Sequence, residues 1–242
     1  SVQELISAGI ACGKAATAGT DAMIALDIGP IGQLLEPLGT LKFEEAYDIF
    51  REEIEAGKDA DLIVIETMTD LYETKAAVLA AKEHSDKPVF VTMTFEENGR
   101  TFTGCTVSAM ALTLEGLGVD ALGVNCSLGP KELLPVVEEI CRLTTLPVIV
   151  KPNAGLPDPV TGAFSVLPDD FAEAMAAFAK LGVSVFGGCC GTTPEHLAAA
   201  YQKLDSMPVV NRPMPEIPPA ICSPSVTIPI TEPRIIGERI NP

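Results

Sequence analysis

Short apolar runs alternate along the chain with stretches that have the spacing of amphipathic helices. The apolar runs lack polar alternation, which is typical of parallel strands buried on both faces. The predicted strands cover 23–28, 62–65, 88–94, 121–126, 147–150 and 183–186. The positions that define the clearest helical faces are Phe43, Tyr47, Phe50, Ile54, Phe171, Met175 and Phe178.

Strands that alternate with helices indicate an α/β fold, either a barrel or a doubly wound sheet. Polar or reactive residues end most of the predicted strands, namely Asp27, Glu66, Thr94, Cys126, Asn153, Cys189 and Cys190. Such residues at many strand ends favour a (β/α)8 TIM-type barrel, because a doubly wound sheet gathers them at one crevice. Only about six βα units can be counted, so we expect two units of the barrel to be missing.

The chain divides near residue 206. We expect a partial barrel over 1–206 and a proline-rich, extended linker over 207–242. Residues 234–242 have the pattern of a first strand of another domain. The chain opens at Ser1 within an apparent helix, which suggests a piece of a longer protein.

Composition narrows the class of partner. Hydrophobic residues make up 47% of the 242 residues, which indicates a globular protein, and no apolar run or leader pattern predicts a membrane span or a signal peptide. A net charge of −17 argues against nucleic acid and anionic membranes as partners. The seven cysteines are an odd number, which fits free thiols in a reducing cytoplasm better than a disulfide framework.

Three of these cysteines form the candidate site. Cys126 ends one predicted strand and Cys189 and Cys190 end another, so the three can converge at one end of a barrel. Three sulfur ligands with one open position describe a catalytic zinc site. The alternative is that all three are small buried apolar side chains. A second alternative is a phosphate-binding barrel, since the helix predicted to start at Thr193 is a natural anion site.

Specific motifs surround these cysteines. The stretch 124–126 (VNC) together with 188–196 (GCCGTTPEH) resembles the zinc-dependent homocysteine S-methyltransferase family. The resemblance extends over 27–30, 66–67, 93–95 and 152–155, and it is closest to the cobalamin-dependent members. Residues 236–242 resemble the opening of the folate-binding barrel that follows in those members. The family's first strand, with its Asp-Gly motif, and its second strand have no counterpart here, so the missing units are the first two.

The resemblance implies a reaction. Zinc on Cys126, Cys189 and Cys190 would hold homocysteine as its thiolate, and transfer of a methyl group would give methionine. Methylcobalamin on a separate module would be the donor and 5-methyltetrahydrofolate the ultimate source, which makes the folate- and cobalamin-binding modules partners. Two alternatives remain: a betaine-like or sulfonium donor, or an inactive fragment that serves as a scaffold.

Two polar residues at strand ends have candidate roles, the first of which comes from the resemblance. Glu66 matches an acidic contact for the amino group of homocysteine, although a carboxylate near a helix start is also favoured by the helix dipole. Asn153 would offer its amide oxygen to the open zinc position until substrate displaces it, or it is simply a turn residue.

The remaining candidates have weaker roles. Asp27 would support the site, Thr94 would line the pocket, and His196 is expected to be structural. Cys141 is assigned to the core, and Cys12, Cys105 and Cys222 receive no role. With substrate contacts absent, we expect weak turnover, and exposed sheet edges predict an opened barrel or a homodimer.

Overall fold

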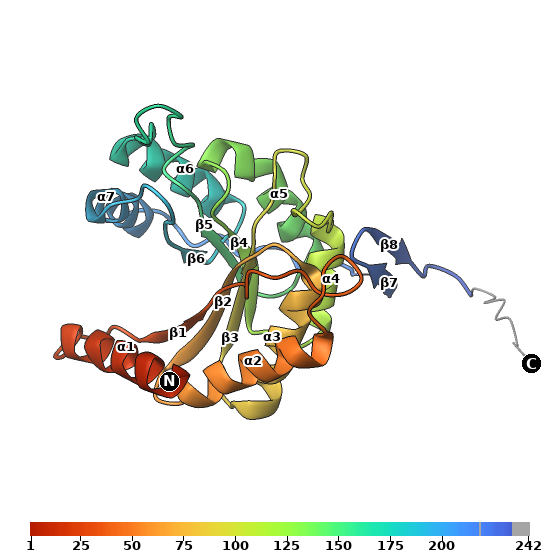
Figure 1. Ribbon diagram of the computed structural model, residues 1–242. Helices are drawn as coiled ribbons and strands as arrows, with labels where there is room; N and C mark the ends of the chain where they lie inside the picture. The colour runs from red at the N-terminus through yellow and green to blue at the C-terminus, as the bar shows by residue number, and fades with distance from the viewer. Residues whose placement is uncertain (218, 234–242) are drawn as a thin grey trace, which may run out of the picture.

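A curved parallel sheet forms the centre of the computed structural model, which describes residues 1–217 and 219–233 (Figure 1). Its six strands pair in chain order, and every pair is parallel. The strands are β1 (Ala25–Ile28), β2 (Leu62–Met68), β3 (Val89–Met93), β4 (Ala121–Asn125), β5 (Val148–Lys151) and β6 (Val185–Phe186). All six predicted strands are therefore present, although β6 is shorter than expected.

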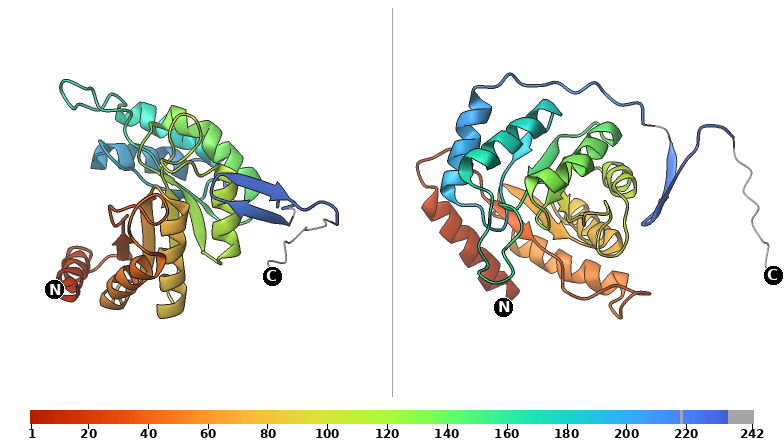
Figure 2. Two further views of the ribbon diagram at one scale, coloured as in Figure 1. Left: turned by 45° about the vertical axis from the view of Figure 1, so that its right-hand side comes forward. Right: turned by 90° about the horizontal axis from the view of Figure 1, so that it is seen from above.

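Seven α-helices in the described part of the chain alternate with the strands and lie around the outside of the sheet (Figure 2, right). They are α1 (Val2–Ala16), α2 (Phe43–Ala56), α3 (Leu71–His84), α4 (Val107–Gly116), α5 (Pro130–Leu143), α6 (Pro168–Lys180) and α7 (Pro194–Asp205). Side-chain caps start several of them: Asp70 accepts a hydrogen bond from the Glu73 amide, and Thr106 from the Ala109 amide. None of these helices is long and apolar enough to cross a membrane.

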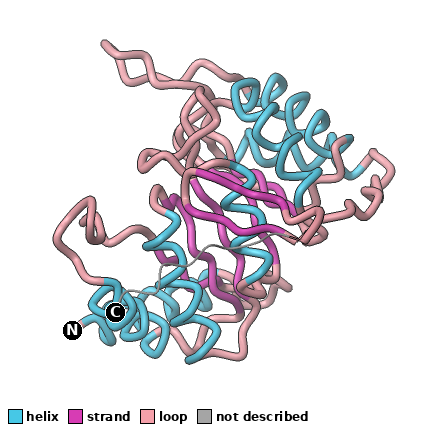
Figure 3. Tube along the Cα trace, turned by 90° about the vertical axis from the view of Figure 1, so that its right-hand side faces the viewer, coloured by secondary structure: helices cyan, strands magenta, loops and turns pink. Residues whose placement is uncertain are grey.

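Figure 3 shows the helices packed along the sheet, and the buried apolar residues of the strands and helices form one core cluster. Ile63 and Ile65, on one face of β2, are buried, whereas Val64 and Glu66 on the opposite face are partly exposed. Phe90 is the register partner of Val64 and is partly exposed as well. The inner face of the sheet is thus less covered than the outer face.

The sheet bends strongly. Lys151 on β5 forms an ion pair with Glu66 on β2, although β3 and β4 lie between them. In a flat sheet, strands three places apart are separated by roughly 14 Å, too far for this contact. In the described residues β1 and β6 each pair with one neighbour only, so the sheet does not close there. The predicted α/β fold is confirmed, and the barrel with its missing units stays a prediction.

The tail contains a hairpin that the sequence did not predict. Strands β7 (Ala220–Ser223) and β8 (Val226–Pro229) pair antiparallel and pack against α4. Ser108 Oγ donates to Thr227 Oγ1 over 3.1 Å, and the Thr106 amide donates to the Pro224 carbonyl over 3.1 Å. The strand predicted at 234–242 lies outside the described residues.

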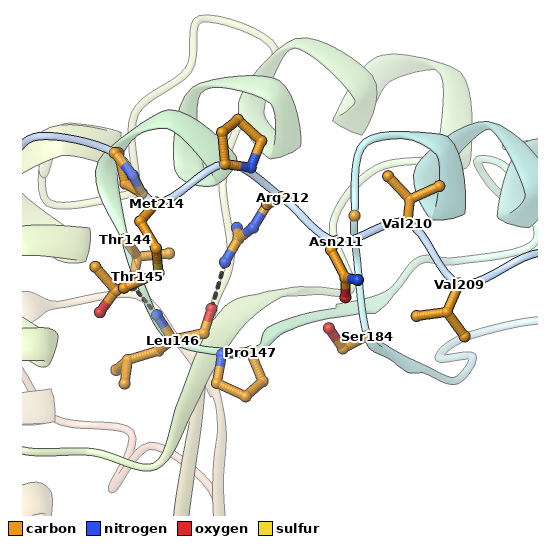
Figure 4. A pocket seen from close by; sticks show the side chains of 13 residues that line it. Thr144, Thr145, Leu146, Pro147, Ser184, Val209, Val210, Asn211, Arg212 and Met214 are labelled. Atoms are coloured by element: carbon orange, nitrogen blue, oxygen red, sulfur yellow. Dashed lines mark hydrogen bonds between the residues drawn. The ribbon is translucent and has the colours of Figure 1, made fainter.

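Between α7 and this hairpin the chain crosses the starting ends of β5 and β6. Arg212 donates a hydrogen bond of 2.6 Å to the Leu146 carbonyl, in a pocket of about 230 Å³ (Figure 4). The stem of Arg212 packs on Gly182, where an added Cβ would lie 2.2 Å from Arg212 Cγ. The tail is therefore fixed to the sheet at the end opposite the cysteines.

Candidate metal centre

Three cysteines meet at the carboxyl ends of β4 and β6. Cys126 directly follows β4, and Cys189 and Cys190 lie in the loop between β6 and α7. Their sulfur atoms all lie within 4.8 Å of one another, and Cys126 Sγ is 3.7 Å from Cys190 Sγ. Within the described residues they are the only group of three or more cysteine, histidine or acidic side chains arranged to hold one metal ion.

Small residues shape the loop that carries Cys189 and Cys190. Gly191 has a φ of +78°, and a Cβ there would lie 2.1 Å from the Phe164 ring. A Cβ at Gly188 would lie 2.4 Å from Thr192 Oγ1, the hydroxyl that donates to the Cys189 carbonyl over 2.7 Å. Glycine is required at both positions, because any side chain would displace these contacts.

The same loop is bonded to the segment that follows β5. The Cys189 amide donates to the Pro152 carbonyl over 2.9 Å, and the Cys190 amide donates to Asn153 Oδ1 over 3.1 Å. Asn153 is buried, with 5% of its surface exposed. Its amide oxygen therefore positions Cys190 in this structure. The role predicted for that oxygen, occupation of an open metal position, stays a prediction.

Cys126 sits in an unusual backbone conformation. Cys126 and Ser127 have φ values of +61° and +58°, in the left-handed region that non-glycine residues seldom adopt. Such a conformation costs on the order of 1–3 kcal/mol per residue and needs support from its surroundings. Support comes from the Cys126 amide, which donates to the Lys151 carbonyl over 3.0 Å, and from the Leu128 amide, which donates to the Cys126 carbonyl over 2.7 Å.

Asn125 connects this strand end to two others, and sequence reasoning gave it no role. Its Oδ1 accepts hydrogen bonds from the Thr67 amide at 2.9 Å and from Thr92 Oγ1 at 2.7 Å. Its Nδ2 donates to Thr67 Oγ1 at 2.8 Å and lies 3.9 Å from Cys189 Sγ. Asn125 is 1% exposed, and Thr67 itself has a φ of +60°. The only sequence signal was a polar side chain at the end of an apolar strand, directly before a cysteine.

The three thiols share protons. A hydrogen bond from the Cys189 thiol is the main cause that lowers the pKa of Cys126 to about 5, with smaller contributions from the Ser127 amide, Cys190 and Asn153. The pKa values of Cys189 and Cys190 are raised, because each donates to Cys126, is partly desolvated and is repelled by its charge. The cluster thus favours a single thiolate on its own, and a bound divalent cation would favour the thiolate form of all three cysteines. Three sulfur donors are the ligands that suit Zn²⁺.

The other predicted residues lie at the same end of the sheet. Glu66 is ion-paired with Lys151, a residue that the sequence did not single out. Asp27 lies on the edge strand β1 and is exposed. Its pKa is raised, mainly by partial desolvation of the carboxylate and also by repulsion from Glu66. The Thr94 hydroxyl is buried and donates to the Met68 carbonyl over 3.4 Å.

His196 belongs to the helix start. Its Nδ1 lies 2.9 Å from Thr193 Oγ1 and accepts from the Thr193 amide at 3.2 Å, and its Nε2 lies 2.9 Å from the Val166 carbonyl. His196 therefore caps α7, as expected of a structural residue. The Thr193 amide and hydroxyl at the start of α7 already contact the His196 ring. This weakens the case for an anion site there.

The remaining cysteines have separate surroundings. Cys105 is buried, and desolvation raises its pKa to about 12. Cys141 packs against the core, and burial raises its pKa too. Cys222 packs against the core from the hairpin, and Cys12 is exposed on α1.

Comparison with known proteins gives the family. The family model described as homocysteine S-methyltransferase matches residues 1–204. The chain belongs to the homocysteine S-methyltransferase family. Among curated proteins it is 36% identical to the methionine synthase of Mycobacterium tuberculosis, with 88% of this chain and 19% of that protein aligned. It is 39% identical to the methionine synthase of Mycobacterium leprae, with 70% of this chain and 15% of that protein aligned.

Solved structures of this family share the fold. The apo form of the Escherichia coli homocysteine methyltransferase MmuM matches with a TM-score of 0.65 and 23% identity, over 83% of this chain and 73% of that one. Its metallated form matches with a TM-score of 0.67 and 24% identity, over 84% of this chain and 71% of that one. The chain therefore spans most of MmuM but less than a fifth of the two methionine synthases.

Proposed function

We propose that Cys126, Cys189 and Cys190 bind one Zn²⁺ and present it to homocysteine for methylation to methionine. The convergence of three sulfur atoms within 4.8 Å carries this proposal. When bound, the ion supplies the positive charge that keeps a substrate thiol deprotonated at neutral pH. The Escherichia coli homocysteine methyltransferase MmuM, which shares the fold, has a metallated form, and this supports metal binding by the present chain.

The residues around the cysteines have defined tasks in this proposal. Asn125 and the glycine-rich loop hold the three sulfurs at one point, which leaves the fourth side of the ion to substrate sulfur. Glu66 binds the amino group of homocysteine. The side-chain oxygen of Asn153 positions Cys190 by accepting from its backbone amide, and we assign the same oxygen to the open metal position when substrate is absent.

For the methyl donor we favour methylcobalamin, with 5-methyltetrahydrofolate as the ultimate source. This choice rests on the resemblance of the cysteine motifs, and the methionine synthases at 36% and 39% identity support methionine as the product. Because the chain aligns with under a fifth of each, both cofactors would sit on other modules. A betaine-like or sulfonium donor is the second candidate. We place the reaction in the cytoplasm, where free thiols stay reduced.

We further propose that residues 1–206 are six consecutive units of a (β/α)8 barrel without its first two, and that 207–242 leads to a folate-binding domain. The strong bend of the sheet and the two single-neighbour strands, β1 and β6, support the missing units. Added strands would also cover Val64 and Phe90 on the inner face. Without them we expect weak turnover and pairing of two copies through the edges.

Metal analysis of reduced, zinc-saturated protein tests the proposal. We expect one zinc per chain in the wild type, and loss of tight binding in Cys126→Ala, Cys189→Ala and Cys190→Ala. Cys12→Ala is the matched control, because this exposed cysteine lies on α1 and should leave the zinc content unchanged. With Co²⁺ in place of zinc, homocysteine should change the thiolate-to-metal absorption. A wild-type protein that holds no zinc under these conditions would refute the proposal.

A further inference from the structure

Lys151 lies directly beside the carboxylate that we assign to the substrate. It ends β5, and its Nζ pairs with Glu66 Oε2 of β2 across the inner face of the sheet. The two side chains are 20% and 26% exposed, so the pair is accessible from the open side. A charge pair that a ligand can reach is a candidate for ligand recognition.

The lysine also borders the metal centre. Its stem lies against Gly187, where an added Cβ would be 2.9 Å from Lys151 Cγ, and Gly187 opens the loop that carries Cys189. On the other side, the Lys151 carbonyl accepts from the Cys126 amide over 3.0 Å. Lys151 thus stands between the two cysteine-bearing strand ends. The Glu66–Lys151 pair is thus anchored beside the strand ends that carry the cysteines.

The charges at this place match the head group of an amino acid. Glu66 and Lys151 present one negative and one positive group side by side. Asp27 adds a second carboxylate, which interacts electrostatically with both. An α-amino acid carries an ammonium and a carboxylate on the same carbon. A bound zwitterion can therefore exchange the Glu66–Lys151 ion pair for two ion pairs between protein and ligand. It brings no net charge into the site.

We propose that Lys151 binds the α-carboxylate of homocysteine while Glu66 binds its ammonium group. The inference rests on the proposed function and adds a specificity residue to it. Glu66 and Lys151 separate when substrate enters, and each takes the opposite charge of the ligand. The site then selects thiols that carry a complete amino-acid head group.

Calorimetric titration of zinc-loaded protein with three thiols tests this assignment. The thiols are homocysteine, its decarboxylated analogue homocysteamine, and its deaminated analogue mercaptobutanoic acid. In Lys151→Met, which keeps an apolar stem over Gly187, homocysteine and mercaptobutanoic acid should bind roughly tenfold or more weakly, the value of one charge-assisted hydrogen bond. Homocysteamine should bind at least as tightly as to the wild type, because Glu66 is released from its lysine partner.

Two further variants separate the roles. Glu66→Gln should weaken homocysteine and homocysteamine but not mercaptobutanoic acid. Lys131→Met, which removes an exposed lysine from the first turn of α5, should change none of the three. The zinc content of every variant is measured alongside and should stay at the wild-type value.

The opposing outcomes are distinct. If Lys151→Met binds all three thiols like the wild type, the inference is wrong. If it weakens homocysteamine as well, Lys151 only positions Glu66, and the inference is again wrong. If the zinc-loaded wild type binds none of the thiols, the proposed function fails and this assignment fails with it.

Discussion

Asn125 offers the sharpest test of how the cysteine site is held together. Its side chain joins β4 to Thr67 of β2 and Thr92 of β3 through three hydrogen bonds of 2.7 to 2.9 Å, and it is 1% exposed. The substitution Asn125→Ala removes all three and leaves the Thr67 amide and two hydroxyls without this partner. It also removes the anchor of Thr67, whose φ is +60°.

The expected cost follows from these contacts. A net contribution of about 1 kcal/mol per hydrogen bond gives about 3 kcal/mol, and a buried group left unpaired adds about 1–3 kcal/mol. We therefore expect Asn125→Ala to lower the free energy of unfolding by about 3 kcal/mol or more. Zinc affinity should fall as well, roughly 10- to 100-fold, because residues that orient metal ligands have effects of that size.

Urea denaturation of the reduced, metal-free protein measures the first quantity, with a shift in midpoint at unchanged slope. Competition with a chromogenic chelator measures the second. Asn98→Ala is the matched control, since exposed Asn98 bonds Glu96 and Arg100 of its own loop, and it should cost below about 1 kcal/mol and leave zinc affinity unchanged. A loss below about 1 kcal/mol in Asn125→Ala, with normal zinc affinity, would show that the network does not support the site.

Three other predictions follow from single features. Gly191→Ala should destabilise the protein by more than Gly162→Ala in thermal unfolding, because both have positive φ but only Gly191 meets a ring, at 2.1 Å; equal effects would contradict this. Glu73 is buried with a raised pKa, caused mainly by desolvation, so its ionisation costs stability as pH rises above its ordinary value of 4.5. Glu73→Gln should therefore be more stable than wild type at pH 7, with the gain lost below about pH 4, and a gain that grows towards acid pH would reverse the assignment. Sedimentation velocity should detect dimers of this chain, because β1 and β6 each have one free edge in the described structure, whereas a monomer at all concentrations would contradict edge pairing.

The strands could be predicted because parallel strands covered by helices become continuous apolar runs. β6 was overestimated because regular pairing with β5 is confined to Val185 and Phe186, although the flanking Ser184 and Gly187 amides still donate to β5 carbonyls. The hairpin β7–β8 was missed because the many prolines in the tail predicted an extended linker without secondary structure. Pro229 is tolerated there, since an edge strand need not donate at every residue.

The cysteines could be found from the sequence because their glycine-rich surroundings are local. Asn125 and Lys151 could not, because their contacts depend on the bend of the sheet. Lys151 meets Glu66 across 85 positions of sequence, and Asn125 meets Thr67 across 58. Apolar periodicity predicts which strands exist, but it carries no information on how far the sheet curls.

The path of the tail has a mechanical consequence. A force applied to the chain beyond Pro233 loads the hairpin first, where Ser108 and the Thr106 amide hold it to α4. The next anchor along the chain is Arg212 at the starting end of β5. Both anchors lie between such a force and the loop of Cys189 and Cys190, which is at the other end of the strands. Displacement of the tail can therefore be absorbed at these anchors without moving the three cysteines.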